Sequence, residues 1–358
     1  MGQMMATVGL PMILGPLIGP VIGGIIFNFL SWQWIFWINV PVTLTSLGLI
    51  IWKMPNYPAQ NKSAKLDLIG TLLLIGSSTS IIYGMVKAAH KANFSNPSTL
   101  TFLATGVSLL IVYVIWGAIR GEKAVIPLNL FKHGSFNGSI IGLFIAGTVL
   151  NGAMLLLPLF FQNVRHMSVL MASLALIPQG LGMLISRPLT GRLTDSIGAK
   201  YVVLVSVFIA FVGTIPFYWI TQSTPYWIIA VVLLVRGIGA GGILTPLMAD
   251  SYSGLRTDQI SSATIGSRIL QNIGSAFGSA LVTTVVTAFS ASHVKSFQHQ
   301  LKTGSLKPAS GQLAAFIHQH LVAIRLDAFQ QGFLMISLAA LLIILPTLLL
   351  SNKMKSKE

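Results

Sequence analysis

The sequence predicts an all-α integral membrane protein with about ten transmembrane helices. Of its 358 residues, 54% are hydrophobic and 8% are charged, and the mean hydropathy is +0.80. A soluble domain carries roughly 25% charged residues, so a soluble fold is excluded. The apolar runs are about 20 residues long, which is the length a helix needs to cross a bilayer. Several runs contain internal Gly and Pro, which membrane helices tolerate.

The expected spans follow one another with short connections. In chain order they are residues 6–28, 32–52, 66–87, 98–119, 135–161, 168–190, 200–221, 226–249, 262–289 and 328–350. Lys and Arg concentrate in alternate connections, which by the positive-inside tendency places both termini of this multi-pass membrane protein in the cytoplasm. The longest connection, 290–327, is expected to be an extracytoplasmic loop. Its apolar spacing from Leu313 to Leu321 predicts one short surface helix there.

The net charge of +15 is explained by the same loop bias. No basic stripe with interleaved aromatic residues occurs, so a nucleic-acid partner is not expected. The absence of cysteine excludes disulfides, iron–sulfur clusters and thiol catalysis. His318 and His320 lack a third ligand at useful spacing, so no metal site is expected.

Small residues recur inside the first expected span, at Gly15, Gly19, Pro20, Gly23 and Gly24. Glycines four residues apart form a flat face that a neighbouring helix can approach closely, and proline kinks the helix. An ordinary tight helix contact explains a lone G-x-x-x-G. The compound pattern, however, resembles the antiporter motif in the fifth span of drug exporters of the major facilitator superfamily. The string from residue 32 to 41, W-Q-W-I-F-W-I-N-V-P, resembles the start of the sixth span.

A second motif lies between the expected spans 168–190 and 200–221. It contains Gly191, Arg192, Asp195, Gly198 and Lys200. As a short turn, it can tie two helix ends together through Asp195 and either Arg192 or a helix N-terminus, or it can be a plain solvated turn. The string resembles the G-x-L-x-D-x-x-G-x-[KR] loop of the same superfamily. That resemblance implies a gating role for this loop.

Arg236 is followed by Gly237, Gly239 and Gly242, which formally match a dinucleotide fingerprint. The apolar run from Tyr226 continues past these glycines, so we expect one membrane span without the strand and turn that a nucleotide loop requires. A cation in mid-span usually faces a cavity or a partner. Arg236 is therefore either a functional charge or a structural one held by an ion pair or hydrogen bonds.

Taken together, the chain resembles the fourteen-span drug:proton antiporters of the major facilitator superfamily over most of its length. The resemblance includes the D-L-I-G string from Asp67, the P-L-x-L-F string from Pro127 and six C-terminal spans. It matches family spans five to fourteen, so the first four are expected to be missing and the N-terminal bundle incomplete. The implied division is 1–53 for the remnant of the N-terminal bundle, 54–133 for two linker spans, 134–352 for the C-terminal six-helix bundle and 353–358 for a cytoplasmic tail.

No enzyme signature occurs, so an enzyme is not expected. The resemblance implies efflux of hydrophobic small molecules by proton antiport with alternating access, in a bacterial plasma membrane, by a monomer without a cofactor. All seven acidic residues lie in loops, at span ends or in the tail, and the position of Asp250 is the least certain. Since a proton-coupled exporter needs a titratable group that reaches both sides, a non-transporting remnant or a split subunit is the alternative.

Overall fold

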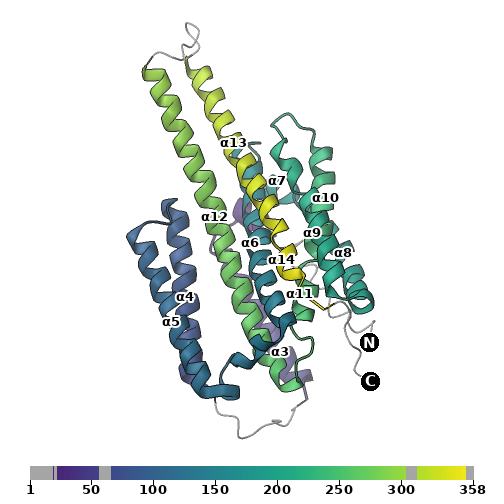
Figure 1. Cartoon of the computed structure of the whole chain (residues 1–358). Coiled ribbons are helices and arrows are strands. Elements are labelled where there is room, and N and C mark those ends of the chain that lie inside the picture. The colour runs from purple at the N-terminus through teal and green to yellow at the C-terminus, as the bar shows by residue number, and fades with distance from the viewer. Residues whose placement is uncertain (1–18, 20–21, 56–65, 304–312, 352–358) are drawn as a thin grey trace.

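The computed structural model describes residues 19, 22–55, 66–303 and 313–351, and all regular structure within these ranges is helical (Figure 1). Nine of the described helical segments are long and apolar enough to cross a membrane. These findings confirm the predicted all-α membrane fold. The first expected span, 6–28, lies mostly outside the described residues, although 22–29 are helical.

The helices follow the expected spans closely. Their bounds are α2 (Trp34–Trp37), α3 (Asn39–Lys53), α4 (Leu68–Lys91), α5 (Pro97–Arg120), α6 (Gly134–Asn163), α7 (Val169–Leu174), α8 (Ile177–Ile197), α9 (Ala199–Val212), α10 (Tyr226–Gly241), α11 (Leu244–Asp250), α12 (Ile260–Lys302), α13 (Leu313–Leu341) and α14 (Ile344–Thr347). Short 3₁₀ turns are η1 (Gly121–Lys123), η2 (Leu128–Lys132), η3 (Ile215–Tyr218) and η4 (Thr257–Gln259).

Helix α6 lies at the centre of the C-terminal bundle. It packs along α12 and against α13, while α8, α9 and α10 pack on one another beside it. The α4–α5 hairpin lies against the other side of α12 (Figure 1). The core between α6, η3 and α13 is aromatic, and its phenylalanines are all at most 4% exposed. They are Phe160, Phe161, Phe217, Phe329 and Phe333.

Glycines allow α12 to approach α6 closely. A Cβ atom on Gly274 would lie 2.1 Å from the carbonyl oxygen of Phe144, and one on Gly278 would lie 2.0 Å from that of Thr148. The Thr148 hydroxyl also donates a hydrogen bond of 3.1 Å to the Gly274 carbonyl. Membrane helices gain little from the hydrophobic effect against one another, so this close van der Waals packing is a main source of their association.

The stretch 290–327, expected as a long loop with one short surface helix, is helical over its described parts 290–302 and 313–327. Helix α12 has 43 residues, about 64 Å at 1.5 Å per residue, and α13 begins at Leu313. No Gly or Pro occurs between Gly278 and Gly304, so nothing in the sequence stops the helix at the membrane edge. Phe297 is 6% exposed and stacks on His320 of α13, with ring centroids 4.9 Å apart. These outer parts, 288–302 and 313–326, are called the projecting hairpin below.

Candidate functional site

The predicted site residues lie in separate parts of the molecule. The bundle has two ends, which we call the hairpin end, from which the projecting hairpin extends, and the Asp67 end opposite to it (Figure 1). The segment from Gly191 to Lys200 lies at the Asp67 end, Arg236 lies within the bundle, and Gly24 contacts α7. None of these residues lines either of the two grooves described below.

The antiporter-type motif is only partly described. Gly15 and Pro20 lie outside the described residues. A Cβ on Gly19 or Gly23 would meet nothing within 4 Å, but one on Gly24 would lie 2.9 Å from the Ser173 hydroxyl of α7. The described glycines that are four residues apart, Gly19 and Gly23, therefore make no close helix contact, whereas Gly24 approaches a helix of the C-terminal bundle.

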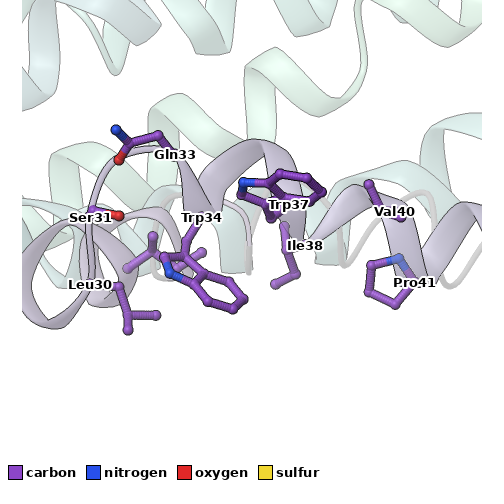
Figure 2. A pocket seen from close by; sticks show the side chains of 9 residues that line it. Leu30, Ser31, Gln33, Trp34, Trp37, Ile38, Val40 and Pro41 are labelled. Carbon is purple, nitrogen blue, oxygen red and sulfur yellow. The ribbon is translucent and has the colours of Figure 1, made fainter.

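The string from 32 to 41 forms α2 and the start of α3, around an apolar groove of about 580 Å³. Figure 2 shows the side chains that line it, with Trp34 and Trp37 among them. Apart from Ser31 and Gln33 the lining is apolar, and neither α2 nor α3 has a buried residue. In a membrane protein this surface is suited to contact with acyl chains or other helices.

The predicted gating loop is mostly helical, which corrects the expectation of a turn from 191 to 200. Helix α8 continues to Ile197, and α9 begins at Ala199. The turn is made by Gly198, which has φ of +90°, a backbone conformation that other residues rarely adopt. No helix breaker separates Gly191 from Gly198, so the helix extends until a glycine ends it.

The expected tie between Asp195 and Arg192 is not formed. Both side chains are exposed, and Asp195 has no hydrogen bond or ion pair with any described residue. Exposed charges attract one another weakly because water screens them, so close spacing on a helix end does not ensure a pair. Instead, the Lys200 ammonium donates to the Leu348 carbonyl at 3.4 Å, which links the start of α9 to the end of α14.

Arg236 is buried among α8, α9 and α10, with 3% of its surface exposed. Its Nη1 donates to the Gln179 side-chain oxygen of α8 at 2.6 Å, whereas its Nε has no partner in the described part of the chain. A Cβ on Gly213 of α9 would lie 2.3 Å from the Arg236 backbone nitrogen, so the helices are in close contact here. Within these residues the guanidinium is held by a hydrogen bond and not by an ion pair.

Gly237 and Gly239 lie in α10, as expected for a membrane span and not for a nucleotide loop, whereas Gly242 lies in the turn that follows α10. The span is not continuous, however, because α10 ends at Gly241 and α11 begins at Leu244. Close contacts explain the glycines: a Cβ on Gly242 would lie 2.2 Å from the Ser206 hydroxyl, and one on Gly237 would lie 2.1 Å from the Gln179 carbonyl.

Among the described residues two carboxylates are buried, and sequence reasoning did not single them out as site residues. Asp250, at the end of α11, is fully buried. Its carboxylate accepts hydrogen bonds from the Ser351 hydroxyl and from the Ser351 backbone N–H, the latter at 3.3 Å. An acidic residue that directly ends an apolar run, as in L-T-P-L-M-A-D, was the available signal.

Asp67 is 6% exposed and joins three segments at its end of the bundle. Its carboxylate accepts hydrogen bonds from the Gly70 N–H at 3.0 Å, the Trp116 indole N–H at 2.9 Å and the Val125 N–H at 3.3 Å. Burial raises the pKa of Asp67, but these hydrogen bonds, with the charge of Arg120, outweigh it and lower that pKa below its ordinary value. Asp67 thus fastens α4, α5 and the segment leading to α6.

These features define a multi-pass α-helical membrane protein whose helices pack through glycine. The model of the Major Facilitator Superfamily matches residues 1–279, and the chain belongs to this superfamily. It is therefore a member of a family of membrane transporters and not of enzymes.

Individual proteins are similar to parts of this chain. The chain is 30% identical to the multidrug resistance protein B homolog of Mycobacterium tuberculosis, over 77% of this chain and 51% of that protein. It is 28% identical to the multidrug export protein EmrB of Haemophilus influenzae, over 89% of this chain and 61% of that protein. A bacterial homologue of the human lysosomal transporter Spinster, solved in an inward-facing conformation, aligns with a TM-score of 0.49 and 14% identity, over 78% of this chain and 69% of that one. The chain spans about half the length of the first of these relatives.

Proposed function

We propose that the protein takes part in the efflux of hydrophobic small molecules by proton antiport, with alternating access to the two sides of a bacterial plasma membrane. The observation that carries the proposal is the kinship with proteins named for multidrug resistance and export.

The contact of Gly24 with α7 supports a rocking motion. The N-terminal part, 22–53, approaches the C-terminal bundle where Gly24 faces Leu170 and Ser173. A glycine contact without long interlocking side chains allows one helix to slide or tilt on another at low cost. Such a seam is suited to two bodies that rock about a substrate.

Asp250 is the carboxylate that we propose for proton coupling. It is the one fully buried acidic residue among the described residues of α6 to α14. Its described partners are the backbone N–H and the hydroxyl of Ser351 and the side chain of Ser139, and no cation is bonded to it. A carboxyl group in such surroundings can take up and release a proton as access to water changes.

The test is accumulation of a hydrophobic cationic dye in cells that express the protein, with and without a protonophore. We expect expression to lower dye accumulation and the protonophore to abolish the difference. Asp250→Asn should lose the export that depends on the proton gradient. Ser351→Ala removes a hydrogen-bond partner but keeps the carboxyl group, so it should retain most of the export. Asp195→Asn tests the gating role and should reduce export without loss of protein from the membrane.

The control is a relative that lowers dye accumulation and is present in the membrane at the same level. If dye accumulation is unchanged by this protein under those conditions, the proposal is overturned. The split-subunit alternative predicts a different result, namely that export arises only when the first spans of a relative are co-expressed. Export by Asp250→Asn equal to that of the unmodified protein would reject Asp250 as the coupling residue.

A further inference from the structure

A groove of about 360 Å³ lies where α6, α12 and α13 meet, at the hairpin end of the bundle. Its floor is apolar and includes Leu156, Leu159 and Phe329. Thr283, Thr287 and Ser290 line it from α12, Asn163 from α6 and Arg325 from α13. A volume of this size is in the range of small-molecule sites. The groove thus combines an apolar floor with one cation and several uncharged polar groups.

The polar groups of the groove are available to a ligand. The Arg325 guanidinium, the Asn163 amide and the hydroxyls of Thr287 and Ser290 form no hydrogen bond or ion pair with the described part of the chain. The Thr283 hydroxyl is used, because it donates to the Ser279 carbonyl at 2.8 Å. Arg325 therefore presents its donors at the exposed rim, where an anion can reach them.

No carboxylate competes for Arg325 from the helices around it. The sequence contains no Asp or Glu between Asp258 and Asp327, so α12 carries none within the groove. Asp327 follows Arg325 on α13 but lies about 200° away around the helix and does not line the groove. On the α6 side, the nearest charge is Arg165, which donates to the Thr224 carbonyl at 2.9 Å. The surroundings favour a ligand with a negative charge.

The contacts of the neighbouring helix ends suggest the level of the rim relative to the bilayer, which we infer to be that of the lipid headgroups. Gln330 on α13 donates to the Ile220 carbonyl at 3.2 Å, beside the turn between η3 and α10. Thr284 on α12 donates to the Ala88 carbonyl near the end of α4 at 3.4 Å. Arg325 and Ser290 lie about 7 to 9 Å further along their helices, at 1.5 Å per residue. That is close to the thickness of one headgroup layer, which is roughly 5 to 8 Å.

We propose that this groove is a binding site for an anionic phospholipid, with the phosphate on Arg325 and the hydroxyls of α12, and an acyl chain on the apolar floor. Arginine binds phosphate through paired N–H groups, and hydroxyl and amide groups add further hydrogen bonds. A phospholipid matches the groove because it joins one anionic group to an apolar chain, and the bilayer supplies it at this level.

The test measures binding of lipids to the purified full chain in a non-ionic detergent. Native mass spectrometry detects the lipid that the protein retains, and the rise in melting temperature reports its stabilising effect. Phosphatidylglycerol is compared with phosphatidylcholine of the same acyl chains. We expect selective retention of phosphatidylglycerol, weakened about tenfold by Arg325→Gln, as for loss of a charged hydrogen bond. Lys295→Gln removes the same charge from the projecting hairpin outside the groove, and should leave the selectivity unchanged. Leu159→Trp fills the floor and should weaken binding without any change of charge.

Three results would overturn the proposal. Equal binding of the two lipids would show that the groove binds acyl chains and does not distinguish one headgroup from the other. An equal loss in Lys295→Gln and Arg325→Gln would indicate diffuse attraction to a cationic surface. Full competition by inorganic phosphate would identify a free anion as the occupant. All of these readouts are independent of dye export, so failure of the transport proposal does not affect them.

Discussion

At the scale of single residues, hydrogen bonds decide what the buried charges do. Asp67 is buried yet ionised at neutral pH, because three N–H groups from three segments converge on its carboxylate. Arg236 is buried with Gln179 as its described hydrogen-bond partner and with an unpartnered Nε. A buried charge is costly unless its hydrogen-bonding groups are satisfied, so both residues constrain the helices around them.

We predict that Asp67→Asn lowers the stability of the protein by about 1 to 3 kcal/mol, because its amide group cannot accept all three hydrogen bonds. The pKa of Asp67 is lowered in the folded protein. Its contribution to stability is therefore fully present above the ordinary value of 3.8 and is lost as the pH falls through the folded-state pKa. Thermal unfolding in detergent as a function of pH measures this effect.

The exposed Glu122, in the neighbouring η1 turn, provides the matched control. Glu122→Gln removes a charge at the same end of the bundle and should change the melting temperature little, since exposed ion pairs contribute little. If Asp67→Asn and the unmodified protein lose stability in parallel on acidification, the hydrogen-bonded carboxylate is not the source of the pH dependence.

At the scale of elements, α12 connects most of the molecule. It packs on α6, α4 and α13, and together with α13 it extends beyond α6 and α4 as the projecting hairpin. Two structural features make this possible. Gly274 and Gly278, in the half of α12 nearer the Asp67 end, allow it to pack closely against α6. The stretch after Gly278 contains no Gly or Pro, so the helix continues to Lys302.

We predict that Gly278→Ala destabilises the protein by about 1 to 3 kcal/mol, because the added methyl group would meet the Thr148 carbonyl and force the two helices apart. Gly191→Ala is the control, since it is also inside a helix but its Cβ would meet nothing within 4 Å. That substitution should leave stability unchanged or raise it by up to about 1 kcal/mol through helix propensity. If the melting temperatures of the two variants do not differ, the close α6–α12 crossing is contradicted.

At the scale of the whole molecule, the two ends differ in shape. At the hairpin end α12 and α13 extend well beyond the neighbouring helices, whereas no pair of helices projects in this way at the Asp67 end among the described residues (Figure 1). The charge bias of the alternate loops predicts that the Asp67 end is cytoplasmic. The projecting hairpin would then stand outside the cell membrane.

We predict that a cysteine in place of Ser296 is labelled by a membrane-impermeant maleimide in intact cells. A cysteine in place of Ser196 should react only after the membrane is opened. Both serines are exposed, and one lies on the projecting hairpin while the other lies at the end of α8. The natural chain contains no cysteine, so neither variant has a background signal. Labelling with the opposite preference would reverse the orientation.

Much of the fold could be predicted because hydrophobic length is a local property. Apolar runs of membrane-spanning length predicted the helices from 32 onward to within a few residues at most ends. The predictions failed where contacts between helices determine the structure. The stretch 290–327 has a polar composition, yet Phe297 of α12 stacks on His320 of α13 and so stabilises the outer parts of both helices. Asp195 and Arg192 are close in sequence, but their exposure leaves them unpaired.

The sequence by itself determined the class of protein, the order of its spans and its resemblance to one superfamily, because bilayer thickness and loop charge act on each segment separately. Only the tertiary structure decided which polar residues act together. The partners of Asp67, Arg236 and Asp250 come from segments distant in the chain. The groove beside Arg325 is formed by three helices. Such sites depend on distances between helices, and no spacing along a single chain encodes those distances.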